Sequence, residues 1–224
     1  MANYINSNIL FQSYANVDAD YSLVSGGDQA TKDYLQNYIE DRAKHFLDST
    51  VSTSLEFKSG SIKAYATVRG TLTSCLPAAG YDFVAAINHL YWFTKRISDA
   101  AVMELAFKTG TYIGSVKRTE ARPGIIGKTK RIIDQFSEIS NKVRKADAYL
   151  DRKSITSKFR KLKKSCEILL DLIKSTDDEK LLKKEFLKLL NKLPLSINSA
   201  GINDNSIKLD YESMHLEFIK YLNS

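Results

Sequence analysis

The strongest local pattern in the chain is an alternation of apolar and polar residues between residues 51 and 69. Apolar residues from Leu55 to Val68 alternate with polar ones on both sides of Ser59-Gly60-Ser61. A period of two, interrupted by a short turn that contains glycine, predicts a β-hairpin with one apolar face. Because a lone hairpin is only marginally stable in water, that face must pack against another element.

The segments before and after this hairpin show the apolar spacing of helices. Apolar residues three and four positions apart predict a helix that Asp28 caps and that ends near Ser49. A second amphipathic helix is predicted from about Phe83 to Leu105, with a break near Ser98. Packing of these helices on the hairpin gives a small α+β unit, which we place over residues 1–118.

The segments next to these elements carry weaker patterns. Residues 1–27 show only weak strand patterns, around Ile9 to Phe11 and again near Tyr21 to Val24, and Thr111 to Val116 are a further strand candidate. Residues 122–127 contain one proline and two glycines, so we expect a loop there.

From this loop onward the apolar period is helical, which predicts a C-terminal antiparallel bundle over residues 119–224. Two seams recur at steps of three and four, and Thr176 followed by Glu179 has the pattern of a capping box for the next helix. A last helix is expected near Asp210 to Leu222. The predicted seam residues are Ile132, Phe136, Ile139, Val143 and Ala146, then Ile155, Phe159, Leu162, Cys166, Leu169 and Ile173, then Leu182, Phe186, Leu189 and Leu193. The predicted fold class is therefore α+β and mostly helical.

The positive charge of the chain is concentrated in one stretch. The net charge is +7, yet residues 117–164 alone hold 16 Lys/Arg against 5 Asp/Glu, and both flanks are close to neutral. Such a density raises a local positive potential that attracts an anionic partner. Most of these cations fall off the apolar seams, so we expect them to be exposed. The predicted anion-binding residues are Lys117, Arg118, Arg122, Lys128, Lys130, Arg131, Lys142, Arg144, Lys145, Arg152, Lys153, Lys158, Arg160, Lys161 and Lys164.

The sequence does not identify the partner of this basic surface. Phosphates of a nucleic acid are one candidate, with an affinity that falls steeply with salt; an acidic partner protein is another. Because Phe136 and Phe159 belong to the predicted core, contact with the phosphate backbone is favoured over stacking on bases. Tyr65 stands apart, since it lies on the polar face of the hairpin beside Lys63 and Arg69 and offers a second contact surface.

No pattern of residues defines a catalytic site. Gly127-Lys128-Thr129 has the ending of a phosphate-binding P-loop, but the first glycine of that motif is missing, because its position holds Arg122. Gly124 and Gly127 at a helix N-terminus, with Lys128, Lys130 and Arg131 nearby, are a candidate site for one phosphate. The three histidines lie on different predicted helices without metal-ligand spacing. We therefore predict no metal and no cofactor, and we favour a binding protein over an enzyme.

Composition and cysteine usage indicate a cytoplasmic globular protein. Hydrophobic residues make up 43% and charged residues 26%, which is ordinary globular usage. Cys75 and Cys166 sit in apolar contexts, which argues against a disulfide scaffold, and the N-terminus has no signal-peptide pattern. The apolar stretch from Leu76 to Phe93 is interrupted by polar residues and is expected to be a buried helix.

The hairpin, the helix from Tyr81 to Ser98 and the string Thr119-Glu-Ala-Arg-Pro-Gly before a basic helix resemble small bacterial proteins, some of them from phage-defence operons. The expected function is thus a non-enzymatic binding or adaptor protein, with a role in anti-phage defence implied by that resemblance. The alternative is a membrane-acting effector that inserts its apolar helix after activation. Contact with a membrane and a homo-oligomer through surplus leucines of residues 181–190 both stay open.

Overall fold

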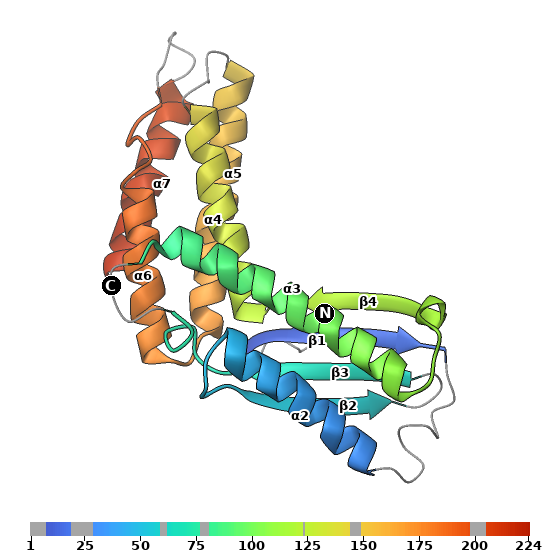
Figure 1. Cartoon of the computed structure of the whole chain (residues 1–224). Helices are drawn as coiled ribbons and strands as arrows, with labels where there is room; N and C mark the ends of the chain where they lie inside the picture. The colour runs from blue at the N-terminus through green and yellow to red at the C-terminus, as the bar shows by residue number, and fades with distance from the viewer. Residues whose placement is uncertain are drawn as a thin grey trace. The chain divides into compact units, whose positions relative to one another are not determined.

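The computed structural model of the chain describes residues 8–18, 29–58, 62–76, 81–122, 124–143, 149–197 and 205–224. The chain divides into two compact units, residues 1–128 and residues 129–224 (Figure 1). Six α-helices and four strands make up the regular structure of the described residues. The predicted fold class, α+β and mostly helical, is confirmed.

A four-stranded antiparallel sheet in the order β2-β3-β1-β4 forms the base of the first unit. Its elements are β1 (Ile9–Val17), α2 (Gln29–Phe46), β2 (Ser52–Lys58), β3 (Ile62–Arg69), α3 (Phe83–Lys108), the short 3-10 helix η1 (Ile113–Ser115) and β4 (Val116–Arg122). Two β-α-β halves are interleaved in one sheet, which is the ferredoxin-like topology. In this order β1 lies at the centre and pairs with both β3 and β4.

The predicted hairpin is present as β2 and β3, but the sheet is larger than the sequence indicated. The strand predicted at Ile9 to Phe11 extends to Val17, and the one predicted near Tyr21 to Val24 lies outside the described residues. The strand expected at Thr111 to Val116 is wrong, because η1 occupies that segment and β4 follows it. The expected break in α3 near Ser98 is also wrong, since the helix runs unbroken over 26 residues.

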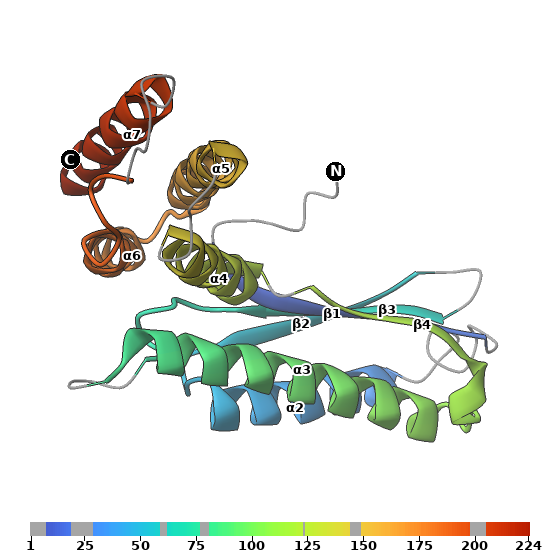
Figure 2. The ribbon, with the colours of Figure 1, turned by 90° about the horizontal axis from the view of Figure 1, so that it is seen from above.

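Helices α2 and α3 lie side by side on one face of this sheet (Figure 2). Helix α2 packs mainly on β2, and α3 packs on β1 and β4. The strands meet them with small or apolar side chains, such as Ala15, Ala64 and Ala66, all of which are buried. Because side chains alternate along a strand, the neighbouring residues of β1 and β3 point to the opposite face.

A loop was expected at residues 122–127, but Arg122 ends β4 and residues 124–127 are the start of α4 (Gly124–Val143). Gly124 has a φ of +40°, and a Cβ at this position would lie 2.4 Å from the carbonyl oxygen of Ile9. Glycine thus permits both the backbone conformation and the close approach of the helix start to β1.

Four helices form the second unit, namely the remainder of α4 together with α5 (Tyr149–Leu172), α6 (Thr176–Leu190) and α7 (Asn205–Asn223). Most predicted seam residues are buried, among them Ile132, Phe159 and Phe186, while Ala146 lies outside the described residues. The cap of α6 is one residue earlier than predicted, since the Ser175 side chain accepts a hydrogen bond from the backbone N–H of Asp178.

A cluster of aromatic rings fills the bundle and surrounds one histidine. His215 on α7 is fully buried, with its ring 5.3 Å from the ring of Phe159 and 5.8 Å from that of Tyr211. The hydroxyl of Tyr211 donates a hydrogen bond of 2.9 Å to the carbonyl of Pro194. Loss of solvation in this apolar setting lowers the pKa of His215, because burial disfavours the charged imidazolium.

We expect Gly124→Ala to destabilise the chain more than Gly110→Ala. Both glycines have positive φ, but a Cβ at Gly110 would meet nothing within 4 Å. Positive φ alone costs about 1–2 kcal/mol, and the collision at Gly124 adds about 1–3 kcal/mol. Urea unfolding of the two variants, followed by circular dichroism, measures the difference. Equal destabilisation of the two variants would show that the α4 start does not depend on its close approach to β1.

Acidification should destabilise the bundle through His215. The unfolded chain binds a proton at the usual histidine pKa of about 6.5, whereas the folded chain resists protonation, so stability falls as pH drops from about 6.5 through the lowered folded pKa. The slope is at most about 1.4 kcal/mol per pH unit for one proton. Urea midpoints of wild type and His215→Phe between pH 7.5 and 5 test this. His45→Gln, which changes an exposed histidine, serves as the control and should keep the wild-type slope.

Candidate nucleic-acid interface

The face of the sheet turned away from α2 and α3 carries polar, aromatic and basic side chains in three rows. Cross-strand partners point to the same face, so the register places one residue of each strand in every row. We name them from β2 to β4. The polar row is Ser54, Thr67, Gln12 and Arg122; the tyrosine row is Glu56, Tyr65, Tyr14 and Glu120; the basic row is Lys58, Lys63, Asn16 and Arg118. Together they form what we call the polar sheet face.

Two tyrosines occupy the centre of this face. Tyr14 on β1 and Tyr65 on β3 are direct cross-strand partners, with ring centroids 4.9 Å apart. Tyr14 is only 8% exposed, whereas Tyr65 is half-buried. Tyr14 therefore supports its neighbour from the side, and Tyr65 is the ring that a ligand can reach.

Cations lie over both rings. The guanidinium carbon of Arg122 is 5.1 Å from the ring centroid of Tyr14 and 5.8 Å from that of Tyr65. From the other edge of the sheet, the Lys58 ammonium lies 5.0 Å from the Tyr65 ring. Attraction between a cation and the negative face of a ring holds these side chains close to the tyrosines. A positive potential thus borders the aromatic centre.

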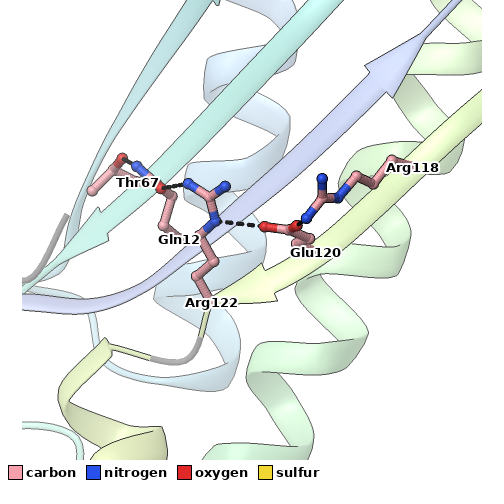
Figure 3. A network of polar contacts seen from close by, with 5 residues as sticks. All are labelled: Gln12, Thr67, Arg118, Glu120 and Arg122. Atoms are coloured by element: carbon pink, nitrogen blue, oxygen red, sulfur yellow. Dashed lines mark hydrogen bonds and ion pairs between the residues drawn. The ribbon is translucent and has the colours of Figure 1, made fainter. Parts of the chain in front are cut away.

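A hydrogen-bond network fixes Arg122 in this position (Figure 3). Its Nε donates to Glu120 at 2.8 Å, and its Nη1 donates to the Gln12 side-chain oxygen at 3.2 Å. Gln12 in turn donates to the Thr67 hydroxyl at 2.8 Å, and Arg118 forms a second ion pair with Glu120. The hydrogen bond from Arg122 lowers the pKa of Glu120, so this carboxylate stays ionised and both arginines stay anchored.

The outer positions of the polar sheet face remain accessible to a ligand. Lys58, Glu56 and Arg118 are exposed, and Lys63 is half-buried. The three rows contain four cations and two carboxylates. One of these carboxylates, Glu120, is already shared by two arginines, so the surface presents a net positive charge around a reachable tyrosine.

The structure separates the predicted basic residues into groups on different elements. Lys117, Arg118 and Arg122 lie on β4, which is a strand and not part of a helical surface. The others lie on two helices, with Lys128, Lys130, Arg131 and Lys142 on α4 and with Arg152, Lys153, Lys158, Arg160, Lys161 and Lys164 on α5; Arg144 and Lys145 lie outside the described residues.

Ion pairs within the bundle offset part of the charge on these helices. Arg160 pairs with Asp210 at 2.9 Å, Lys163 pairs with Glu217 at 2.7 Å, and Lys158 pairs with Glu138. Lys130 pairs with Asp134 one helical turn away, and Lys117 of the first unit pairs with Asp18 at 2.8 Å. Exposure was predicted for Arg152, yet it is only 4% exposed, because its position on α5 faces the interior of the bundle.

Three lysines of α5 do not take part in these ion pairs. Lys153, Lys161 and Lys164 are exposed and lie on the same side of the helix, and no ion pair within the described residues involves them. We call them the α5 stripe. It is what remains of the predicted surface on α5 once burial and pairing are taken into account. On α4, Arg131 and Lys142 are exposed as well, and no ion pair within the described residues involves them.

The predicted phosphate site at Gly127 lies in the buried first turn of α4. Because α4 begins at Gly124, Gly127 lies inside the first turn, and residues 124–127 are all buried. The backbone N–H groups that would cradle a phosphate are therefore shielded from solvent. Thr129, the last residue of the P-loop-like string, is fully buried as well.

The described part of the chain has neither a metal-binding cluster nor a membrane-spanning helix, and both cysteines are buried. No group of three His, Cys, Asp or Glu side chains is placed there to hold a metal ion. Neither Cys75 nor Cys166 forms a disulfide, and both are buried. Burial raises the pKa of the Cys166 thiol, which opposes formation of the thiolate. None of the helices described is long and apolar enough to cross a membrane.

Sequence reasoning identified part of the polar sheet face. It placed Tyr65, Lys63 and Arg69 on the polar side of the hairpin as a second contact surface. It missed Tyr14, although the alternation of Phe11, Ser13, Ala15 and Val17 with polar residues carries a strand signal. It also missed Gln12 and the role of Glu120, since only the pairing of β1 with β3 and β4 brings them together.

Comparison with known proteins adds no assignment to this geometry. The chain matches no protein family model, and no curated protein or solved structure shows a significant match to it.

Proposed function

We propose that this protein binds single-stranded nucleic acid on the polar sheet face of its first unit. In this proposal the Lys58 ammonium moves from the Tyr65 ring to a phosphate, and a base stacks on the ring in its place. Lys63 and Arg118 of the basic row contact the adjacent phosphates. The observation that carries the proposal is the pair of cross-strand tyrosines, 4.9 Å apart, bordered by cations on both sides.

The spacing of the rows supports this arrangement. Residues two positions apart on a strand are separated by about 7 Å, so the basic row lies about one nucleotide away from the tyrosine row. An aromatic ring provides stacking for any base, and flanking cations neutralise the backbone. Four-stranded sheets with aromatic side chains on their central strands are an established means of holding unstacked bases.

The aromatic centre also favours nucleic acid over an acidic partner protein. Carboxylates of a protein would use the cations and leave Tyr65 without a matching group, whereas a nucleotide uses both. A duplex keeps its bases stacked on one another and cannot offer a face to Tyr65. Single strands are therefore the form that fits this surface.

The α5 stripe is a second candidate for contact with phosphates. Lys161 and Lys164 are exposed and lack ion-pair partners among the described residues, so they can add affinity that does not depend on sequence. Its contribution can be measured separately, because the stripe belongs to the second unit.

Tyr65→Ala should weaken binding of a mixed-sequence single-stranded 12-mer by roughly 5- to 150-fold, because stacking on one aromatic ring contributes about 1–3 kcal/mol. Tyr65→Phe keeps the ring and should bind within about twofold of wild type. Fluorescence anisotropy at low salt gives these affinities. Tyr112→Ala is the matched control, since Tyr112 is 79% exposed and lies outside the polar sheet face.

Three results would overturn the proposal: equal affinity for single and double strands, no effect of Tyr65→Ala, or no binding of any oligonucleotide. In the last case, retention of an acidic partner protein or of anionic liposomes would instead support one of the two alternatives drawn from the sequence.

Lys58→Gln combined with Lys63→Gln should reduce the salt dependence of binding. Each lysine that neutralises a phosphate of a single strand adds about 0.7 to the slope of log K against log salt, so the double variant should have a slope smaller by about 1.4. Lys161→Gln combined with Lys164→Gln removes the same charge from the α5 stripe. If that second variant shows the larger reduction in slope, the bundle rather than the sheet binds most of the phosphates.

A further inference from the structure

The two carboxylates at the ends of the tyrosine row differ in their surroundings. Glu120 accepts hydrogen bonds from Arg122 and pairs with Arg118, so its oxygens are occupied. Glu56, at the opposite end, is exposed, and no hydrogen bond or ion pair within the described residues involves its side chain. An unpaired carboxylate beside a reachable aromatic ring is available to a ligand.

Register places Glu56 directly beside that ring. It is the cross-strand partner of Tyr65, and the Cβ atoms of such partners lie about 5 Å apart on the same face. A base stacked on Tyr65 therefore brings one of its edges within reach of the carboxylate. Lys58 is two residues further along the same strand, so its ammonium can hold the phosphate while Glu56 meets the base.

From this geometry we infer that Glu56 selects bases with an exocyclic amino group, and in particular cytosine over uracil. This inference rests on the proposed function. An ionised carboxylate only accepts hydrogen bonds, and the amino group of cytosine donates them. Uracil carries a carbonyl oxygen at the same position, which repels the carboxylate. Glu56 would then determine specificity, while Tyr65 and the basic row provide affinity.

The test compares oligo(dC) and oligo(dU) octamers by fluorescence anisotropy at pH 7.5. Wild type should bind oligo(dC) roughly tenfold more tightly than oligo(dU), as expected for one specific contact to a base edge. In Glu56→Gln this ratio should fall to about one, because an amide both donates and accepts hydrogen bonds. Removal of a negative charge raises the affinity for both octamers alike. The ratio of the two affinities therefore reports base recognition alone.

Asp41→Asn is the matched control, since it removes the same charge from an exposed position on α2, outside the polar sheet face, and should keep the wild-type ratio. Glu56→Asp retains the charge but shortens the reach, and should give an intermediate ratio. A wild-type ratio near one, or an unchanged ratio in Glu56→Gln, overturns the inference while the proposed function stands. If neither octamer binds, and the mixed 12-mer does not bind either, the proposed function itself fails.

Discussion

The antiparallel pairing of β1 with both β3 and β4 is the constraint on which the first unit depends. It joins three segments that are far apart in the chain, Ile9–Val17, Ile62–Arg69 and Val116–Arg122. Without β1, the predicted hairpin would have one apolar face and two free edges. With it, the hairpin becomes half of a four-stranded sheet whose apolar face is covered by α2 and α3.

The same pairing creates the polar sheet face. Successive side chains of a strand point to opposite faces of the sheet. The pairing of β1 with β3 therefore packs Ala15 against the helices and also places Tyr14 beside Tyr65 on the other face. The Arg122 network crosses from β4 to β1 and β3, and it keeps a guanidinium over both rings. A face organised in this way can supply stacking, charge and hydrogen bonds to one ligand, which is why we base the proposed function on it.

The predicted basic surface shows how folding redistributes charge. The surplus of positive charge in residues 117–164 is a property of the sequence, but its members lie on one strand and two helices. Burial removes Arg152, and acidic partners on α4 and α7 pair with Lys158, Arg160 and Lys163. Those acidic partners are distant in sequence, so a count of charges along residues 117–164 could not show which cations they neutralise. Exposed ion pairs of this kind add little stability, but they lower the net potential that a ligand meets.

The sequence by itself determined the elements whose cause is local. Alternation between Leu55 and Val68 specified the hairpin, and apolar steps of three and four specified the helices, with most of the predicted seam residues buried. Strand β4 could not be recognised, because Val-Lys-Arg-Thr-Glu-Ala-Arg has no apolar alternation and is held by hydrogen bonds to β1. Only the tertiary structure decided that Tyr14, Tyr65, Glu56 and Arg122 share one surface. The physical reason is that register between distant strands arises from long-range hydrogen bonds and a shared core, which no local pattern encodes.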